Sequence, residues 1–219
     1  MDIEKHEWLR NRSRHALRSN EFVFINQLGW RSNGEPMWTK PIEESIVLVG
    51  CSQTYAGTLP YKDTFAYHLE QSLDRQVINL GRPMGSPEWI WKMLVDIKQN
   101  AKPWAIVINW PSPFRYYEWH TDRFGVLTFD VLQRDQALYR FYLEHPEFLQ
   151  KYNDYIIKSS RLMWQEHTRL VEMTWSIDLS DQTHMIHQAD SVSTQDKHWG
   201  VKTNKLAASY IIDQLSRKV

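Results

Sequence analysis

The chain has 219 residues and carries 26 basic and 26 acidic side chains, so its formal net charge at pH 7 is zero. This length suits a single α/β domain with a substantial core, and the balanced charge predicts binding neither to nucleic acid nor to an anionic membrane. The one cysteine, Cys51, excludes an internal disulfide and a cysteine-rich zinc site.

Strands and helices are expected to alternate along the first half of the chain. Residues 1–20 form a polar arm without the apolar core of a signal peptide. No apolar run approaches the ~18 residues of a transmembrane helix, so we expect a cytoplasmic protein. Short apolar runs then alternate with amphipathic, capped segments. The predicted strands are 46–50, 76–81 and 104–109, and the predicted helices are 63–75, capped by Asp63, and 86–100, capped by Ser86.

This alternation predicts an open, doubly wound sheet. The runs are continuous instead of alternating between apolar and polar residues, as in parallel sheets that helices cover on both faces. In such sheets ligands bind beyond the carboxyl ends of the strands. Those ends carry Gly50-Cys51-Ser52, Gly81 and Asn109, so we expect these residues to converge at one edge.

The second half of the chain departs from this rhythm. Residues 111–150 are rich in aromatic side chains and are expected to form a largely helical insertion, which either overhangs the sheet edge or only packs on it. Further strands are predicted at 174–180 and 183–189. An amphipathic last helix follows over 201–219, with Leu206 on its buried face.

Three polar residues are candidates for nucleophilic catalysis. Ser52 follows the first strand on a tight turn, where its hydroxyl lies near backbone N–H groups. Asp196 and His198 are two residues apart before the last helix and can point the same way. His198 would take the Ser52 proton while Asp196 orients the imidazole ring. For a developing oxyanion the candidate donors are the Gly81 N–H and the Asn109 amide.

These segments resemble the sequence blocks of the SGNH (GDSL-type) hydrolases. Gly50-Cys51-Ser52-Gln53-Thr54 is similar to the first block, with Cys51 in place of an aspartate, and Asn79-Leu80-Gly81 is similar to the second. Asp196-Lys197-His198-Trp199 is similar to the last block, in the form found in SGNH-like polysaccharide O-acetyltransferases. The third block is represented by Asn109 without the usual glycine and aspartate, which leaves Ser112 as a fallback donor. The resemblance covers residues 25–110 and 175–215.

The resemblance implies a three-layer α/β/α fold with a mostly parallel, flavodoxin-like sheet, the SGNH hydrolase fold. It implies Ser52 as nucleophile, His198 as base and Asp196 as its orienting partner, with an oxyanion hole formed by Ser52, Gly81 and Asn109. The expected activity is that of a serine esterase, which hydrolyses a small-molecule or carbohydrate ester through an acyl-enzyme. No cofactor and no metal are expected.

Several alternatives stay open at this point. The same acyl-enzyme would serve an O-acyltransferase that acts on a sugar hydroxyl, for which Trp110 and Trp199 are weak candidates as substrate contacts. A catalytically inactive protein of this fold would be a binding or structural protein. Cys51 is a rival nucleophile. A metal site at His184 and His187 is disfavoured, because a spacing of three on a strand places side chains on opposite faces. Homo-oligomerisation is left open.

Overall fold

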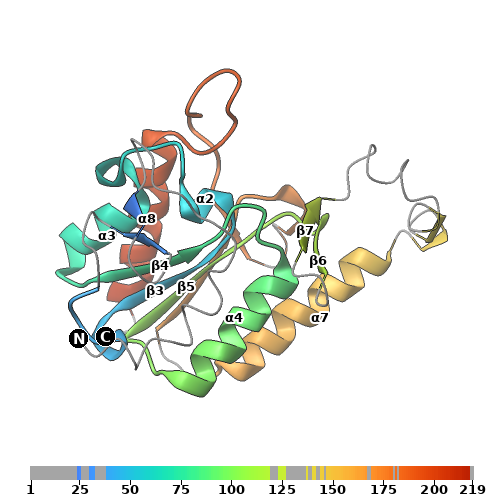
Figure 1. Cartoon of the computed structure of the whole chain (residues 1–219), viewed down its shortest axis with the longest axis horizontal. Helices are drawn as coiled ribbons and strands as arrows, with labels where there is room; N and C mark the ends of the chain where they lie inside the picture. Colours follow the sequence, from blue (N-terminus) through green and yellow to red (C-terminus); the bar gives the residue numbers. More distant parts are fainter. Residues whose placement is uncertain are drawn as a thin grey trace.

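The computed structural model places a five-stranded parallel sheet at the centre of the protein (Figure 1). It describes residues 24–25, 30–32, 38–118, 123–126, 137, 140–141, 144–145, 147–166, 169–179, 181 and 183–217. The strands lie in the order β4-β3-β5-β8-β9, and every neighbouring pair is parallel. With the strands numbered along the chain this is the order 2-1-3-4-5 of flavodoxin-like sheets. The predicted fold class is therefore confirmed.

The elements follow one another along the chain in a β-α-β pattern. The sheet strands are β3 (Ile46–Gly50), β4 (Val77–Gly81), β5 (Ala105–Trp110), β8 (Leu170–Thr174) and β9 (His184–Met185). The α-helices are α2 (Ser52–Tyr55), α3 (Phe65–Leu73), α4 (Pro87–Asn100), α7 (Phe148–Met163) and α8 (Val201–Ser216). Two short antiparallel pairs lie outside this sheet, formed by β1 (Phe24–Ile25) with β2 (Arg31–Ser32) and by β6 (Arg115–Glu118) with β7 (Arg123–Val126). Single 3₁₀ turns are η2 (Ile42–Glu44), η3 (Tyr61–Asp63) and η4 (Ile177–Leu179).

Alternate residues of each strand bury against helices on opposite faces of the sheet. Val47 and Val49 of β3 belong to a core with α4 and α7, whereas Ile46 and Leu48 belong to a core with α3 and α8. The two helix pairs cover the two faces in Figure 1. Because both faces are covered, every residue of β3, β4 and β5 is buried. This explains why the strands are continuous, mostly apolar runs instead of alternating apolar and polar residues.

Helix starts are set by local capping. The Ser86 hydroxyl accepts a hydrogen bond from the Trp89 N–H, and Pro87 occupies the first turn of α4, as predicted. Helix α3 begins later than expected, because Thr64 caps it by accepting from the Tyr67 N–H. Asp63 instead ends the 3₁₀ turn η3.

Three expectations for the second half of the chain are corrected. The fourth strand is Leu170–Thr174, and the predicted strand at 174–180 gives way to the 3₁₀ turn η4. The first part of the insertion expected at 111–150, which was expected to be loop-like, contains the antiparallel pair of β6 and β7. Leu206 is half exposed, since it lies on the solvent side of α8. The arm at 1–20 lies outside the described residues, as does much of the insertion. Within the described ranges, no helix combines the length and apolar character needed to cross a membrane.

Candidate active site

Ser52 lies where the central strand β3 gives way to the single helical turn α2. Cys51 is the N-cap of that turn, and Ser52 is its first residue, half-buried at the carboxyl edge of the sheet. Because the first residues of a helix have no intrahelical acceptor, the Ser52 N–H points out of the turn. The hydroxyl and this N–H are therefore presented together at the edge where ligands bind in such sheets.

Two glycines allow α2 to sit directly on the strand ends. A Cβ at Gly50 would lie 2.1 Å from the Thr54 hydroxyl oxygen, and a Cβ at Gly81 would lie 2.5 Å from the Tyr55 backbone nitrogen. Both approaches are far closer than van der Waals contact. The glycines that end β3 and β4 are thus required by the packing of the turn that carries Ser52.

Asp196 and His198 form a hydrogen-bonded pair. The Asp196 Oδ1 atom lies 2.5 Å from Nδ1 of His198 and also accepts the His198 backbone N–H at 3.0 Å. Burial acts to raise the pKa of Asp196, but hydrogen bonds from His198 and from the Thr58 side chain outweigh it and lower the pKa below its ordinary value. The carboxylate is therefore ionised at neutral pH. With Nδ1 held by Asp196, the Nε2 atom of His198 is the nitrogen left to act on a substrate or nucleophile.

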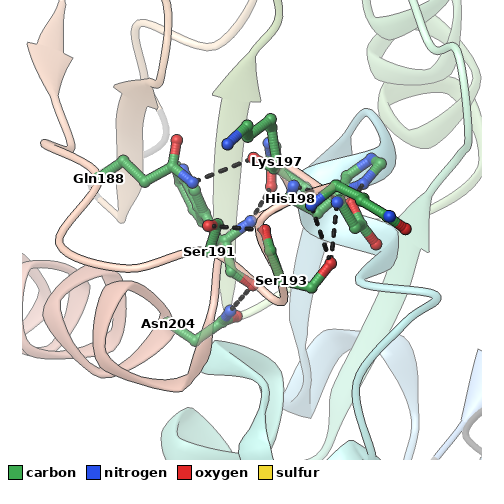
Figure 2. A network of polar contacts seen from close by, with 10 residues as sticks. Gln188, Ser191, Ser193, Lys197, His198 and Asn204 are labelled. Atoms are coloured by element: carbon green, nitrogen blue, oxygen red, sulfur yellow. Dashed lines mark hydrogen bonds and ion pairs between the residues drawn. The ribbon is translucent and has the colours of Figure 1, made fainter.

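Hydrogen bonds within the loop that carries this pair stabilise its conformation (Figure 2). Ser193 Oγ accepts the backbone N–H groups of Gln195 and Asp196 at 3.2 and 3.0 Å. Gln188 donates to the Lys197 carbonyl oxygen at 3.0 Å. These bonds fix the turn in which Asp196 and His198 face the same way.

The start of α8 fixes the far end of the same loop. The Asp190 carboxylate accepts the backbone N–H groups of Lys202 and Thr203 at 2.9 and 2.8 Å. Burial acts to raise the pKa of Asp190, but these bonds and the Thr203 hydroxyl lower it below its ordinary value. The residue two positions after His198, Gly200, must lack a side chain because a Cβ there would lie 2.5 Å from the Asp190 carboxylate.

A hydrogen bond joins the His198 loop to the Ser52 turn. The Trp199 N–H donates to Gln53 Oε1 at 2.8 Å. The Thr58 side chain, six residues after Ser52, acts to lower the pKa of Asp196. The donor of the bond follows His198 in one segment and its acceptor follows Ser52 in the other, so the two predicted catalytic segments lie against each other. Within the described residues no hydrogen bond joins the Ser52 hydroxyl to the His198 ring, and such bonds often form only with substrate bound.

Gly81 and Asn109, two of the candidate oxyanion donors, differ in their hydrogen-bond partners. The Gly81 N–H donates to Asn79 Oδ1 at 2.8 Å, while Asn79 Nδ2 donates to the Thr54 carbonyl at 2.8 Å. Asn79 thereby pins α2 to β4 and occupies the Gly81 N–H, which differs from the expectation that this N–H faces the ligand. Asn109 pairs with Gly50 in the sheet register and is fully buried. Its amide nitrogen and oxygen have no hydrogen-bond partner among the described residues.

The rival nucleophile Cys51 and the two candidate substrate contacts, Trp110 and Trp199, are buried. Cys51 is inaccessible, and its Sγ atom accepts the Trp175 indole N–H at 3.3 Å, which opposes a nucleophilic role. Trp110 is a core residue whose indole donates to Glu172 at 2.9 Å. Trp199 packs edge-on against Phe65 in the core beneath α8. Neither indole ring lines an open groove.

A cavity of about 300 Å³ lies beyond the carboxyl ends of β5 and β8. Its apolar wall includes Phe114, Ile177 and Leu179. Trp175, two residues before Ile177, contacts Cys51 beside the nucleophile position. The cavity therefore lies at the carboxyl edge of the sheet, the edge at which Ser52 follows β3. Its lining residues are Pro113, Phe114, Leu149, Gln150, Ile177, Asp178, Leu179 and Asp181.

Three residues that hold these segments by hydrogen bonds were not identified from the sequence: Gln53, Asp190 and Arg31. Each acts through a contact to a residue distant in the chain, such as the bond between Gln53 and Trp199. No local spacing encodes such contacts.

Two further candidates from the sequence are Ser112 and His184. Ser112 is half-buried, and its hydroxyl oxygen accepts the Phe114 N–H at 3.3 Å. His184 stacks on Tyr210 at 3.9 Å between ring centroids.

No family model matches the sequence, and no curated protein matches it. Solved structures do match. TesA has 11% identity and a TM-score of 0.47, covering 80% of this chain and 99% of its own. A member of the lipolytic protein G-D-S-L family from Veillonella parvula has 13% identity and a TM-score of 0.45, covering 79% and 98%.

A carbohydrate esterase, whose active site is described as displaying divergent catalytic and non-catalytic binding functions, has 11% identity and a TM-score of 0.46. The match covers 84% of this chain and 68% of that one. The motifs of the chain resemble those of the SGNH (GDSL-type) hydrolases, and its sheet has the flavodoxin-like strand order 2-1-3-4-5.

Proposed function

We propose that this protein is a serine esterase that hydrolyses esters through an acyl-enzyme on Ser52. The observation that carries the proposal is the Asp196–His198 pair, held at 2.5 Å and tied by the Trp199–Gln53 bond to the turn that begins with Ser52. A base oriented by a carboxylate and placed beside a serine hydroxyl is the arrangement that activates such a nucleophile.

The chemistry follows from which atoms are engaged. Ser52 Oγ attacks the ester carbonyl carbon while its proton passes to Nε2 of His198. Asp196, ionised because its pKa is lowered, stabilises the imidazolium that forms. The carbonyl π electrons move onto oxygen, and the oxyanion then collapses to expel the alcohol, which takes the proton from His198. Water, activated by His198, attacks the acyl-Ser52 ester and releases the carboxylic acid.

The oxyanion donors in this proposal are the Ser52 N–H and the Asn109 amide. Asn109 has a buried amide without a partner in the described residues, and such a group calls for an explanation. A developing oxyanion would supply the missing acceptor for its N–H. Loss of one such donor costs roughly 10²–10³ in turnover.

We assign the acyl chain to the cavity beside Phe114 and Ile177. Its wall combines apolar side chains with Gln150, Asp178 and Asp181, and Trp175, which precedes Ile177, contacts Cys51. Esters of short to medium aliphatic acids are therefore the proposed substrate class, carried on a small alcohol or a carbohydrate.

The test compares hydrolysis of p-nitrophenyl acetate and butyrate by the wild type, Ser52→Ala and His198→Ala. Matched controls are Ser72→Ala and His187→Ala, which remove a serine and a histidine from exposed positions. Both site variants should lose activity by at least roughly 10³-fold, while the controls retain it. Full activity in either site variant on every ester the wild type cleaves would refute the proposal.

A non-catalytic binding protein is the second candidate. The observation that favours it is the Gly81 N–H, which is committed to Asn79 and unavailable to an oxyanion. In that case the edge around Ser52 would bind an ester or a carbohydrate without turnover. A folded wild type that binds such a ligand by calorimetry, but neither hydrolyses it nor reacts with a phosphonate, would support this candidate.

A further inference from the structure

Arg31 is a basic side chain buried beneath the turn that carries Ser52. Only 1% of its surface is exposed, and it reaches this position from β2. Its guanidinium donates to the backbone carbonyl oxygens of Tyr55 and Ala56, and to that of Leu59 at 2.6 Å. The guanidinium carbon also lies 5.9 Å from the ring centroids of Tyr55 and of Tyr61.

Arg31 binds the carbonyl of the last residue of α2 and two carbonyls of the turn that follows it. Helix α2 ends at Tyr55, and Ala56 follows as its C-cap with φ at 49°, in the left-handed region that favours glycine. The last carbonyls of a helix have no intrahelical partner, and the Ala56 carbonyl also accepts the Leu59 N–H at 3.2 Å. A planar guanidinium presents several N–H donors in a fixed geometry, so one side chain can bind all three carbonyl oxygens at once.

The segment held by Arg31 contacts both halves of the candidate site. Ser52 begins it, and Gln53 accepts the Trp199 N–H at 2.8 Å. Thr58 lies between Ala56 and Leu59, two of the residues whose carbonyls bind Arg31, and its side chain acts to lower the pKa of Asp196. A shift of this segment would therefore move the nucleophile and loosen the loop of the base together.

We propose that Arg31 is a positioning residue, whose guanidinium holds residues 52–59 in the conformation that sets Ser52 against His198. The inference rests on the proposed serine chemistry, to which it adds a residue outside the triad. Burial lowers the pKa of Arg31 to about 10, and the hydroxyl groups of Tyr55 and Tyr61 act in the opposite direction, so the side chain stays charged at neutral pH.

Two variants separate the charge of Arg31 from its geometry. Arg31→Lys keeps the charge but replaces the planar fork by a point charge, and Arg31→Gln keeps a planar amide donor without the charge. The matched control is Arg75→Lys. Arg75 donates to the Glu44 carbonyl at 3.1 Å and stacks on Trp104 at 4.0 Å, but it lies next to the amino end of β4, at the other edge of the sheet.

The first readout is amide hydrogen exchange, which does not depend on activity. In either folded Arg31 variant, peptides from 51–59 and from 193–200 should exchange at least about tenfold faster than in the wild type, while the β4 peptide 77–81 is unchanged. Arg75→Lys should leave all three at wild-type rates. Unchanged exchange over 193–200 in a folded Arg31 variant would overturn the inference.

The second readout is the split between kcat and KM, together with the rate of phosphonate labelling. Misplacement of a reacting group by about 1 Å can cost roughly 10²-fold, so kcat and the labelling rate should fall by about 10- to 100-fold. KM should stay within about threefold, and the assay is run well below each variant's melting temperature. A purely structural role would lower the melting temperature but leave kcat per folded molecule within about twofold, and that result would also overturn the inference.

Failure of the proposed function gives a different result. A folded wild type that neither hydrolyses esters nor reacts with a phosphonate would refute the proposed function, and hydrogen exchange alone would then decide whether Arg31 positions the two segments.

Discussion

Replacement of Asp196 by asparagine should lower turnover strongly while leaving the fold intact. Asp196 Oδ1 accepts both the ring Nδ1 and the backbone N–H of His198. Asparagine has the same shape, so only the charge and the donor pattern change. The outcome depends on which atom of the new amide faces the imidazole ring.

The two orientations of the amide bracket the size of the effect. If the amide oxygen faces Nδ1, the hydrogen bonds persist but the negative charge is lost. Opposite charges 2.5 Å apart attract by about 2 kcal/mol even at the dielectric constant of water. The side chains of His198 and Asp196 are 39% and 27% exposed, so this aqueous value is a suitable lower bound. It corresponds to roughly 30-fold in rate. If the amide NH₂ faces Nδ1, the proton moves to Nε2 and His198 no longer acts as base, which costs about 10⁴-fold.

The assay is kcat for p-nitrophenyl acetate at pH 7, with the fold checked by thermal melting. Asp213→Asn is the control, because it removes an exposed carboxylate that pairs with Arg217 on α8. We expect Asp196→Asn to lose between about 30- and 10⁴-fold in kcat, and the control to lose nothing measurable. A folded Asp196→Asn protein with kcat within about threefold of wild type would refute the role given to this carboxylate.

Three further predictions concern substrate preference, acid stability and the core. Ile177→Asp should weaken the preference for p-nitrophenyl butyrate over acetate by up to roughly tenfold, since each of the two additional methylenes is worth about 0.8 kcal/mol when buried; an unchanged ratio of kcat/KM would place the acyl chain elsewhere. Because folding lowers the pKa of Asp190, this carboxylate stabilises the folded state at pH values above about 3.9, the pKa of aspartate in an unfolded chain. That stabilisation is lost as the pH falls through the pKa of Asp190 in the folded protein. Urea titration of wild type and Asp190→Asn should therefore give the largest difference in free energy of unfolding near about pH 6 and a smaller difference below about pH 4. A difference that does not change with pH would contradict this. Leu48→Ala, at a fully buried position of β3, should destabilise by about 2–5 kcal/mol, whereas Leu206→Ala, half exposed on α8, should change stability by less than about 0.5 kcal/mol.

The central strands were predictable because their burial is encoded locally. Residues 46–50 and 76–81 are short, mostly apolar runs that end in glycine, and the structure buries β3 and β4 on both faces. The strand β8 was not predicted, because Glu172 interrupts its apolar pattern. That carboxylate is accommodated by Arg161 and by the Trp110 indole, neither of which is near it in the chain. A strand whose polar residue is satisfied by distant partners cannot be recognised from its own sequence.

In the candidate site, too, features encoded in one short segment could be predicted, whereas contacts between distant residues could not. The Asp196–His198 pair could be predicted because both residues lie in one short turn. The engagement of the Gly81 N–H could not, since it depends on the rotamer of Asn79. Arg31 could not be placed either, because its partners lie at least 24 residues away along the chain.

Phosphonate labelling tests the central claim most directly. Wild type and Ser52→Ala are each incubated with a p-nitrophenyl alkylphosphonate, and the adduct is read by intact mass and located by peptide mapping. We predict a single adduct on Ser52 in the wild type and none in Ser52→Ala. A folded wild type without an adduct, or an adduct that persists in Ser52→Ala on Cys51 or another residue, would contradict the account.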